Sequence, residues 1–369
     1  MKPKILFIMH MPPPVHGAAM MGKYIHDSKL INDTFDCLYI NPSASKEVAN
    51  VGKINLKKFL FLFSNIYKII KTVLRKKPDL CYFTSTVGGV GIFRDMIIVG
   101  VLKLLRQKIV LHLHNKGAKK YNQKQPLSII AYKIIFSNVK VIQLSEYLYE
   151  DIEKFVAKTN IFICPNGIPE TLVTEPSVNR NNSVPKLLFL SNLLIDKGVF
   201  TLLDACKILK DKGYKFSCDF VGGETIDINA ERFYQEVQVR ELTNTVAYRG
   251  RKYGKEKEAF FNHADIFVFP TFYKGETFGL VNLEAMEHKL PIVSTDEGGI
   301  PDVVKNGENG FICIKDNPDS LAKCIEKLLL DKNLRYKMGE DGYKKFKTYY
   351  TLPTFEKNIK SILMQCIKN

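Results

Sequence analysis

Two apolar segments in this chain each lead through a short loop and a glycine into a helical pattern. The first is Lys4–His10, followed by a proline-rich loop and Gly17, and the second begins at Lys186 and leads to Gly198. A buried strand, a loop with glycine and a helix form the opening of a doubly wound α/β domain. At 369 residues the chain is longer than one typical core. We therefore expect two Rossmann-like domains, each with its ligand site at the carboxyl ends of parallel strands.

A segment rich in proline and asparagine separates the two expected domains. It runs from 169 to 185 and follows an Asn-Gly turn at 166–167, which is typical of a chain leaving a folded domain. We therefore expect an N-terminal domain over 1–170, a linker over 171–185 and a C-terminal domain over 186–352.

The positive charge of the chain is concentrated in its first half. Residues 1–170 hold 25 Lys and Arg against 11 Asp and Glu, a net charge of +14, whereas the remainder has a net charge of +2. Such asymmetry indicates an anionic partner, which could be membrane lipid, nucleic acid or an acidic glycan. Because no nucleic-acid-binding motif accompanies it, we favour a membrane surface and expect no nucleic acid partner.

The rest of the composition is typical of a globular protein of the cytoplasm. Apolar residues make up 46% and charged residues 25% of the chain. We find no run of about 18 uncharged apolar residues and no signal peptide, so we expect a cytoplasmic location. The eight cysteines are scattered without a Cys-x-x-Cys pair. Reduced thiols in the core, and no zinc site, are therefore expected.

Residues 53–77 have the pattern of a basic amphipathic helix. Polar and basic residues gather on one side of a helical wheel and apolar residues on the other. The first side carries Lys53, Lys57, Ser64, Lys68, Lys71 and Arg75, and the second carries Leu62, Phe63, Ile66, Ile70 and Val73. This pattern fits either a core helix with a solvated face or a helix at a membrane interface.

The segment Gly275–Ala285 follows an apolar strand pattern over 265–270 and carries two glutamates. Glu276 is expected just before a helix and Glu284 about five residues into it, roughly 7 Å along the axis. The amides of Phe278–Leu280 would lie at the positive end of the helix dipole, where anions bind. Carboxylates accept hydrogen bonds from the paired hydroxyls of a ribose or hexose. The arrangement suits a nucleotide sugar, although the spacing alone also fits a surface helix with two ordinary glutamates.

Further motifs follow this glutamate pair: Pro291–Val304 combines a strand pattern with a glycine loop, and Asn306–Ile312 is a turn. Together with the Glu-x7-Glu spacing, they resemble the retaining glycosyltransferases of family 4 (glycosyl transferases group 1), over nearly the whole chain. The resemblance implies the GT-B fold, an α/β architecture of two Rossmann-like doubly wound domains facing a central cleft. It also implies a C-terminal helix over 353–369 that packs back towards the N-terminal domain.

The activity implied by the resemblance is retaining transfer of a hexose-type sugar from a nucleotide-diphosphate sugar to a glycan or lipid-linked acceptor. The family works without a metal or other cofactor, and this sequence has no Asp-x-Asp motif or ligand-spaced His/Asp cluster. The basic first domain and the expected location favour a lipid-linked acceptor at the inner membrane face. Surface polysaccharide assembly, of capsule, exopolysaccharide or lipopolysaccharide, is the implied process.

In the second domain, the resemblance assigns the donor site. Glu276 would hold the sugar hydroxyls and Glu284 the ribose, while Lys197 would stabilise the departing diphosphate together with the backbone of Phe278, Gly279 and Leu280. Asn192 stands where the family has an arginine beside the pyrophosphate. An asparagine can donate a hydrogen bond there but supplies no charge.

In the first domain, the resemblance places Gly17 near the donor phosphates and acceptor, although Gly17 could simply permit a tight turn. His114, at a strand end, would face the reacting end of the sugar. We expect it to fit this role better than His112, whose side chain is expected to point the other way. The loop with Lys116, Lys119, Lys120 and Lys124 could attract an anionic acceptor or be an ordinary solvated loop.

Two other classes of function remain open. Nucleotide-sugar epimerases share the architecture but act on the donor alone, and the Glu-x7-Glu match argues against them. A catalytically inactive, membrane-associated scaffold is favoured only by Asn192, whereas Gly17, Lys197, Glu276 and Glu284 argue for an active enzyme.

Overall fold

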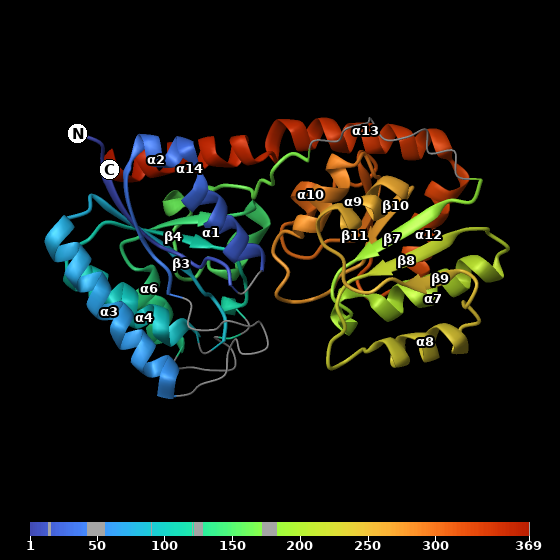
Figure 1. Cartoon of the computed structure of the whole chain (residues 1–369), viewed down its shortest axis with the longest axis horizontal. Helices are drawn as coiled ribbons and strands as arrows, with labels where there is room; N and C mark the ends of the chain where they lie inside the picture. The colour runs from blue at the N-terminus through green and yellow to red at the C-terminus, as the bar shows by residue number, and fades with distance from the viewer. Residues whose placement is uncertain are drawn as a thin grey trace. The chain divides into compact units, whose positions relative to one another are not determined.

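The computed structural model describes residues 1–13, 16–42, 56–89, 91–119, 121, 128–171 and 183–368 (Figure 1). The chain divides into two compact units. Unit 1 comprises Met1–Asn166 and Leu352–Asn369, and unit 2 comprises Gly167–Thr351. Lys53, Lys120, Lys124 and positions 172–182 of the expected linker lie outside the described residues, as does the side chain of Lys57.

Unit 1 is built on a six-stranded parallel sheet of order β2-β1-β3-β4-β5-β6. Its strands are short apolar runs, as expected for a sheet covered on both faces. They are β1 (Lys4–Ile8), β2 (Asp36–Ile40), β3 (Leu80–Ser85), β4 (Ile109–Leu113), β5 (Lys140–Gln143) and β6 (Ile161–Ile163). The strand order reverses between β1 and β3, and open sheets bind ligands outside the strand ends at such a switch point.

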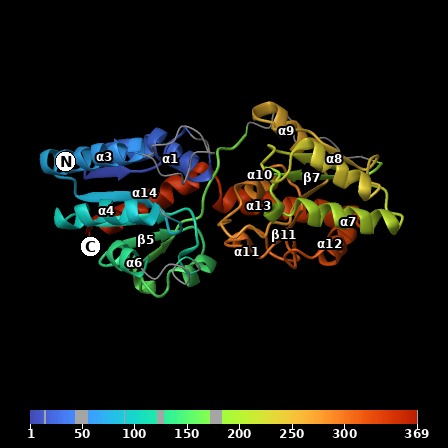
Figure 2. The same cartoon turned by 90° about the horizontal axis from the view of Figure 1, so that it is seen from below.

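Helices cover both faces of this sheet. Figure 2 shows α3 (Leu56–Lys76), α4 (Gly91–Leu104) and α6 (Ser128–Phe136) along one side of it. Of the further helices whose bounds the structure describes, unit 1 contains α1 (Gly17–Asp27), α2 (Lys29–Thr34) and α14 (Leu352–Lys368), and α14 contacts α2. The 3-10 helices are η2 (Glu146–Asp151), capped by Ser145, and η3 (Lys158–Asn160). The C-terminal helix is thus part of unit 1.

Unit 2 repeats the plan with a parallel sheet of order β12-β11-β10-β7-β8-β9. The strands are β7 (Lys186–Leu190), β8 (Ser217–Val221), β9 (Val246–Tyr248), β10 (Ile266–Phe269), β11 (Ile292–Thr295) and β12 (Gly310–Cys313). The chain moves outward from β7 to β9 and then returns to place β10 on the other side of β7. The switch point of unit 2 therefore lies between β7 and β10.

The helices of unit 2 pack over its two faces, and α7 and α12 contact each other, as do α10 and α13. Their bounds are η4 (Ile195–Lys197), α7 (Val199–Asp211), α8 (Ala230–Val239), α9 (Gly254–His263), α10 (Leu280–Glu287), α11 (Ile300–Val303), α12 (Pro318–Leu330) and α13 (Lys332–Tyr349). All eight cysteines of the chain are free thiols, and six are buried. The expected α/β architecture of two doubly wound units is confirmed.

Helix α3 buries only part of its apolar side. Asn65, Ile69 and Val73 are the buried positions, and the basic residues Lys68, Lys71 and Arg75 are exposed as predicted. Phe63 lies on the apolar side of the wheel, as predicted, but it is exposed. With Leu60, Tyr67 and Leu74 it forms a row of apolar side chains that are 57–65% exposed, which we call the α3 apolar row. The buried part of α3 is therefore narrower than the apolar side of the wheel.

Candidate functional site

The loops after β7 and β10 bring a lysine and a glutamate together at the switch point of unit 2. The Nζ of Lys197 lies 2.5 Å from Oε2 of Glu276, and the two side chains are only 13% and 14% exposed. The ammonium also lies over the rings of Phe269 (5.3 Å) and Tyr273 (4.7 Å). The two aromatic faces attract the ammonium, and its burial limits the positions that the side chain can take. An ion pair so enclosed is a fixed polar centre.

The backbone explains how Lys197 reaches this position. Gly198, in the left-handed region (φ 81°), lies so close to the end of β10 that a Cβ there would be 2.4 Å from the carbonyl oxygen of Pro270. The amide of Phe272 donates to the carbonyl of Asp196 at 2.8 Å. Glycine is therefore required after Lys197 because the two loops touch through their backbones.

Helix α10 begins four residues after Glu276, and the side chain of Glu276 contacts the helix cap. Gly279 caps the helix in the left-handed conformation, and its amide donates to Oε1 of Glu276 at 3.0 Å. The ring of Phe278 is buried against Tyr350, so Phe278 can face a ligand only through its backbone. We expected the amides of Phe278, Gly279 and Leu280 to be free for an anion. For Gly279 this is wrong, because the neighbouring carboxylate accepts from that donor.

The second glutamate lies on the fifth residue of α10, as predicted. Both carboxylate oxygens of Glu284 are 2.9 Å from Nζ of Lys257 on α9. Sequence reasoning missed Lys257, which stands in an ordinary run of charged helical residues. Only the packing of α9 beside α10 shows that the two charges meet.

The loops after β7, β8 and β9 converge next to this centre. A Cβ on Gly222 would lie 1.7 Å from the carbonyl oxygen of Ser191, so the first two loops touch. The amide of Gly223 donates to Oδ1 of Asn192 at 3.3 Å, and the amide of Gly222 donates to the carbonyl of Gly250 at 3.0 Å. The side chain of Asn192 thus ties two loops together at the strand ends by accepting a hydrogen bond, at the position where the sequence predicted an uncharged hydrogen-bond donor.

The glycine loop after β11 supports Glu276 from a third direction. Gly298 has φ 59°, and a Cβ there would lie 2.4 Å from the carbonyl oxygen of Glu276. The amide of Gly299 donates to the carbonyl of Thr277 at 2.7 Å. The loop therefore fixes the backbone on which the glutamate stands. The two glycines are visible in the sequence, but no pattern there connects them with Glu276.

In unit 1, histidines gather at the carboxyl ends of β1 and β4. His114 directly follows β4, and its ring lies 4.1 Å from that of His112. The two side chains share one face of the sheet, so the expectation that His112 points the other way is wrong: alternation puts residues two apart on the same side. The hydroxyl of Tyr82 lies 2.5 Å from Nδ1 of His112. Of the two, His114 remains the one beyond the strand.

The start of α1 lies near these rings. His16 caps the helix by accepting from the amide of Ala19 at 3.3 Å, and Gly17 is the exposed first residue of the helix. Burial and the neighbouring His16 lower the pKa of His114 to about 3. His114 is therefore neutral at cellular pH.

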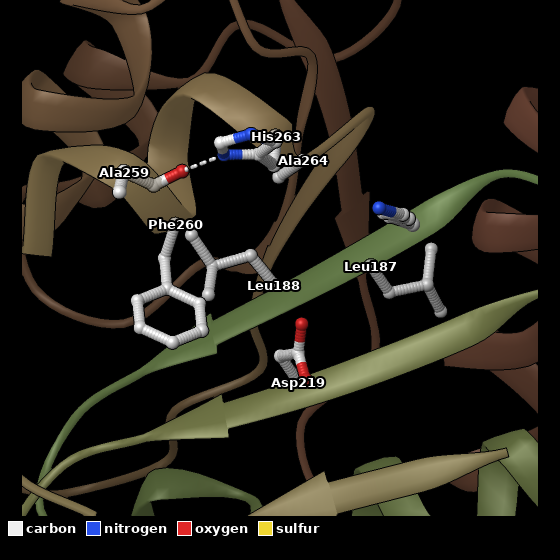
Figure 3. A pocket seen from close by; sticks show the side chains of 8 residues that line it. Leu187, Leu188, Asp219, Ala259, Phe260, His263 and Ala264 are labelled. Carbon is white, nitrogen blue, oxygen red and sulfur yellow. Dashed lines mark hydrogen bonds between the residues drawn. The ribbon is translucent and has the colours of Figure 1, made fainter. Parts of the chain in front are cut away.

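A separate pocket of unit 2 lies beside strands β7 and β8 (Figure 3). It has a volume of about 250 Å³ and lies between α9 and the sheet, with Lys186, Leu188, Asp219, Phe260 and His263 in its lining. Its lining extends from Lys186 at the start of β7 to Leu188 and Asp219 in the middle of β7 and β8, so this pocket is not at the carboxyl ends of the strands. It is not the Lys197–Glu276 centre. Within the described ranges, no three His, Cys, Asp or Glu residues cluster as ligands for a metal ion.

Known proteins similar to this chain agree in family. Residues 172–345 match the family model described as Glycosyl transferases group 1. The chain is 27% identical to the capsular polysaccharide biosynthesis glycosyltransferase CapM of Staphylococcus aureus, over 87% of this chain and 86% of CapM. It is 24% identical to the lipopolysaccharide 1,2-N-acetylglucosaminetransferase of Salmonella typhimurium, over 81% of this chain and 82% of that enzyme.

Solved structures share the fold over the full length. A glycosyltransferase from Rickettsia africae superposes with a TM-score of 0.78 at 18% identity, covering 100% of this chain and 99% of that one. Anabaena HepE in complex with UDP gives 0.76 at 17% identity, covering 98% and 100%. The family match lies within unit 2, and the solved structures share the fold of the whole chain, so the chain has the GT-B fold and is similar to glycosyltransferases of this fold.

Proposed function

We propose that this protein is a retaining glycosyltransferase that moves a hexose-type sugar from a nucleotide-diphosphate sugar to a glycan or lipid-linked acceptor. The observation that carries the proposal is the enclosed Lys197–Glu276 pair beside the start of α10, at the switch point of unit 2. The names of CapM and the Salmonella enzyme support assembly of a surface polysaccharide. HepE, solved with UDP-glucose, supports a nucleotide sugar as donor.

Each charged pair of unit 2 retains capacity for a ligand. A carboxylate offers about four acceptor positions, and an ammonium three donors. Glu276 uses positions for Lys197 and Gly279 and has others for sugar hydroxyls, while Lys197 has donors left for a phosphate oxygen. Glu284, held by Lys257, would accept from the ribose hydroxyls. As the sugar leaves, Lys197 stabilises the growing charge on the diphosphate, so the proposed reaction needs no metal or other cofactor.

We assign the acceptor to unit 1. Neutral His114 can donate from one ring nitrogen and accept at the other, which suits contact with the hydroxyls at the reacting end of the sugar. The proposed attack comes from the face that the diphosphate leaves, without a covalent intermediate, so the anomeric configuration is retained. Gly17, at the start of α1, lets an acceptor or phosphate approach the backbone closely.

A panel of UDP-, GDP-, ADP- and CMP-sugars in buffer with EDTA tests this function. A ligand that binds only the folded protein raises the melting temperature. At a ligand concentration of 100 times the Kd, the free energy of unfolding increases by about 2.7 kcal/mol. We expect one nucleotide to give a shift that Glu284→Ala abolishes. Proton NMR of the product made with that donor should show the donor's own anomeric configuration. No shift with any donor, or release of free sugar without an acceptor, would contradict the proposal.

We further propose that the enzyme works in the cytoplasm and attaches peripherally to an anionic membrane surface. Of the helices in the described ranges, none is both long and apolar enough to span a bilayer. The α3 apolar row lies beside the exposed basic residues Lys68, Lys71 and Arg75. Apolar side chains next to a basic stripe are typical of a helix lying in the interface of an anionic membrane.

Vesicle sedimentation tests the membrane surface. The protein should sediment with phosphatidylglycerol vesicles and remain in solution with phosphatidylcholine vesicles. A triple variant of the α3 apolar row, Leu60→Ser, Phe63→Ser and Tyr67→Ser, should lose most of this binding. As a control, Leu330→Ser with Tyr336→Ser removes exposed apolar side chains from unit 2 and should leave binding unchanged. Equal sedimentation of all three proteins would refute the assignment.

A further inference from the structure

The charges that meet at the centre of unit 2 cancel one another. Lys197 is paired with Glu276 at 2.5 Å, and Lys257 with Glu284 at 2.9 Å. A diphosphate brings at least two negative charges, and its binding calls for positive charge that no carboxylate already neutralises. The donor site of the proposed function therefore requires another cation at the same end of the sheet.

Arg251, in the loop after β9, has the right position. Its guanidinium lies on Gly223: a Cβ on that glycine would be 2.2 Å from Nη2 and 2.6 Å from Nε. Gly223 is itself tied to the loop after β7, because its amide donates to Asn192 and its carbonyl accepts from Leu193 at 2.8 Å. The guanidinium thus lies over the backbone that joins the loops at the carboxyl ends of β7 and β8.

The charge of Arg251 is also uncompensated. Within the part of unit 2 that the structure describes, no carboxylate forms an ion pair with it, and the residue is exposed. Two residues earlier, Arg249 pairs with Asp219 at 2.6 Å, and Arg240 pairs with both Asp204 and Glu236. Arg251 keeps its planar fork of donors free on the side away from Gly223, in the geometry that binds phosphate oxygens.

We propose that Arg251 binds the diphosphate of the donor, as the uncompensated cation that complements Lys197. This inference rests on the proposed function and names the residue that recognises the phosphate groups. It also gives Asn192 a physical reason. Both residue 192 and the guanidinium of Arg251 contact Gly223, so a cation at position 192 would repel the guanidinium. The neutral amide of Asn192 instead accepts from Gly223 and holds that glycine beneath Arg251.

Calorimetric titration of the nucleoside, its monophosphate and its diphosphate tests this role, once the donor panel has named the base. Arg251→Gln should weaken diphosphate binding about tenfold to a hundredfold, since hydrogen bonds to charged groups are lost, and leave nucleoside binding unchanged. Arg249→Gln makes the same change in net charge two residues away and should leave all three affinities unchanged. Arg251→Lys should restore part of the loss, because it keeps the charge without the fork.

A second variant changes Gly223, over which the guanidinium lies, and leaves Arg251 in place. Gly223→Ala would displace the guanidinium while keeping its charge, so it should weaken diphosphate binding alone and have no further effect in Arg251→Gln. Arg251 does not bind phosphate if the Arg251→Gln variant binds the diphosphate as tightly as the parent does. The same conclusion follows if the substitution lowers the affinity for the nucleoside as much as the affinity for the diphosphate. If the parent binds no nucleoside diphosphate at all, the proposed function fails instead. The two failures are thus distinguishable.

Discussion

Replacing Glu276 with glutamine should lower kcat for sugar transfer by about a hundredfold or more, the scale on which a group stabilising the transition state contributes. The amide keeps an oxygen that can accept from Gly279 but loses the charge that faces Lys197. Lys197 then carries an uncompensated charge, so the nucleoside diphosphate product should bind at least as tightly as it binds the parent. Initial rates at saturating donor, together with calorimetric titration of the diphosphate, measure the two effects.

Two matched variants separate this result from a general loss of charge or fold. Glu284→Gln should lower the affinity for the nucleoside diphosphate, since Glu284 is assigned to the ribose. Glu308→Gln removes an exposed carboxylate from a turn of unit 2 and should change neither quantity. If Glu276→Gln lowered the affinity for the nucleoside diphosphate by as large a factor as it lowered kcat, Glu276 would bind the nucleotide part of the donor. Its assigned contact with the transferred sugar would then be wrong.

Much of the fold could be predicted because parallel strands are buried on both faces. Such strands are short apolar runs, and the polar or glycine residues after them mark the edge where sites lie. The sequence predicted a strand that ends at His114, which is β4, and a strand over 265–270 with Glu276 beyond it, which is β10. These inferences depend on neighbours in sequence, which is where the patterns carry information.

The charge partners could not be predicted, because they depend on which loops and helices touch. Lys257 meets Glu284 across 27 positions, and Arg251 reaches Gly223 across 28. Neither lysine nor arginine stands in a pattern that distinguishes it from a solvated residue. Helix α3 shows the same limit: the helical wheel ranks residues by polarity, but only the packed neighbours decide that Phe63 is exposed.

Unit 1 should lose stability in mild acid before unit 2 does. Burial, Arg94 and the neighbouring His16 and His114 lower the pKa of His10 to about 3, and burial with His16 lowers that of His114 to about 3. Burial and His114 also lower the pKa of His112. In the unfolded chain a histidine takes up its proton near pH 6.5. Between pH 6.5 and about 3 the unfolded state therefore binds more protons, and the free energy of unfolding falls as the pH falls.

From pH 7 to pH 5 the loss should be about 2 kcal/mol for each of His10 and His114, since each pH unit is worth about 1.4 kcal/mol per proton. Hydrogen exchange at the two pH values, corrected for intrinsic rates, resolves the units separately. Strands β1 and β4 should lose protection at pH 5 while β7 and β10 keep it. His114→Asn should reduce the loss of unfolding free energy in unit 1 by the contribution of one histidine, about 2 kcal/mol. His263→Asn, which replaces an exposed histidine of unit 2, should leave the loss in unit 1 unchanged. Equal loss in both units would mean that the histidines at the ends of β1 and β4 are not held neutral by the fold.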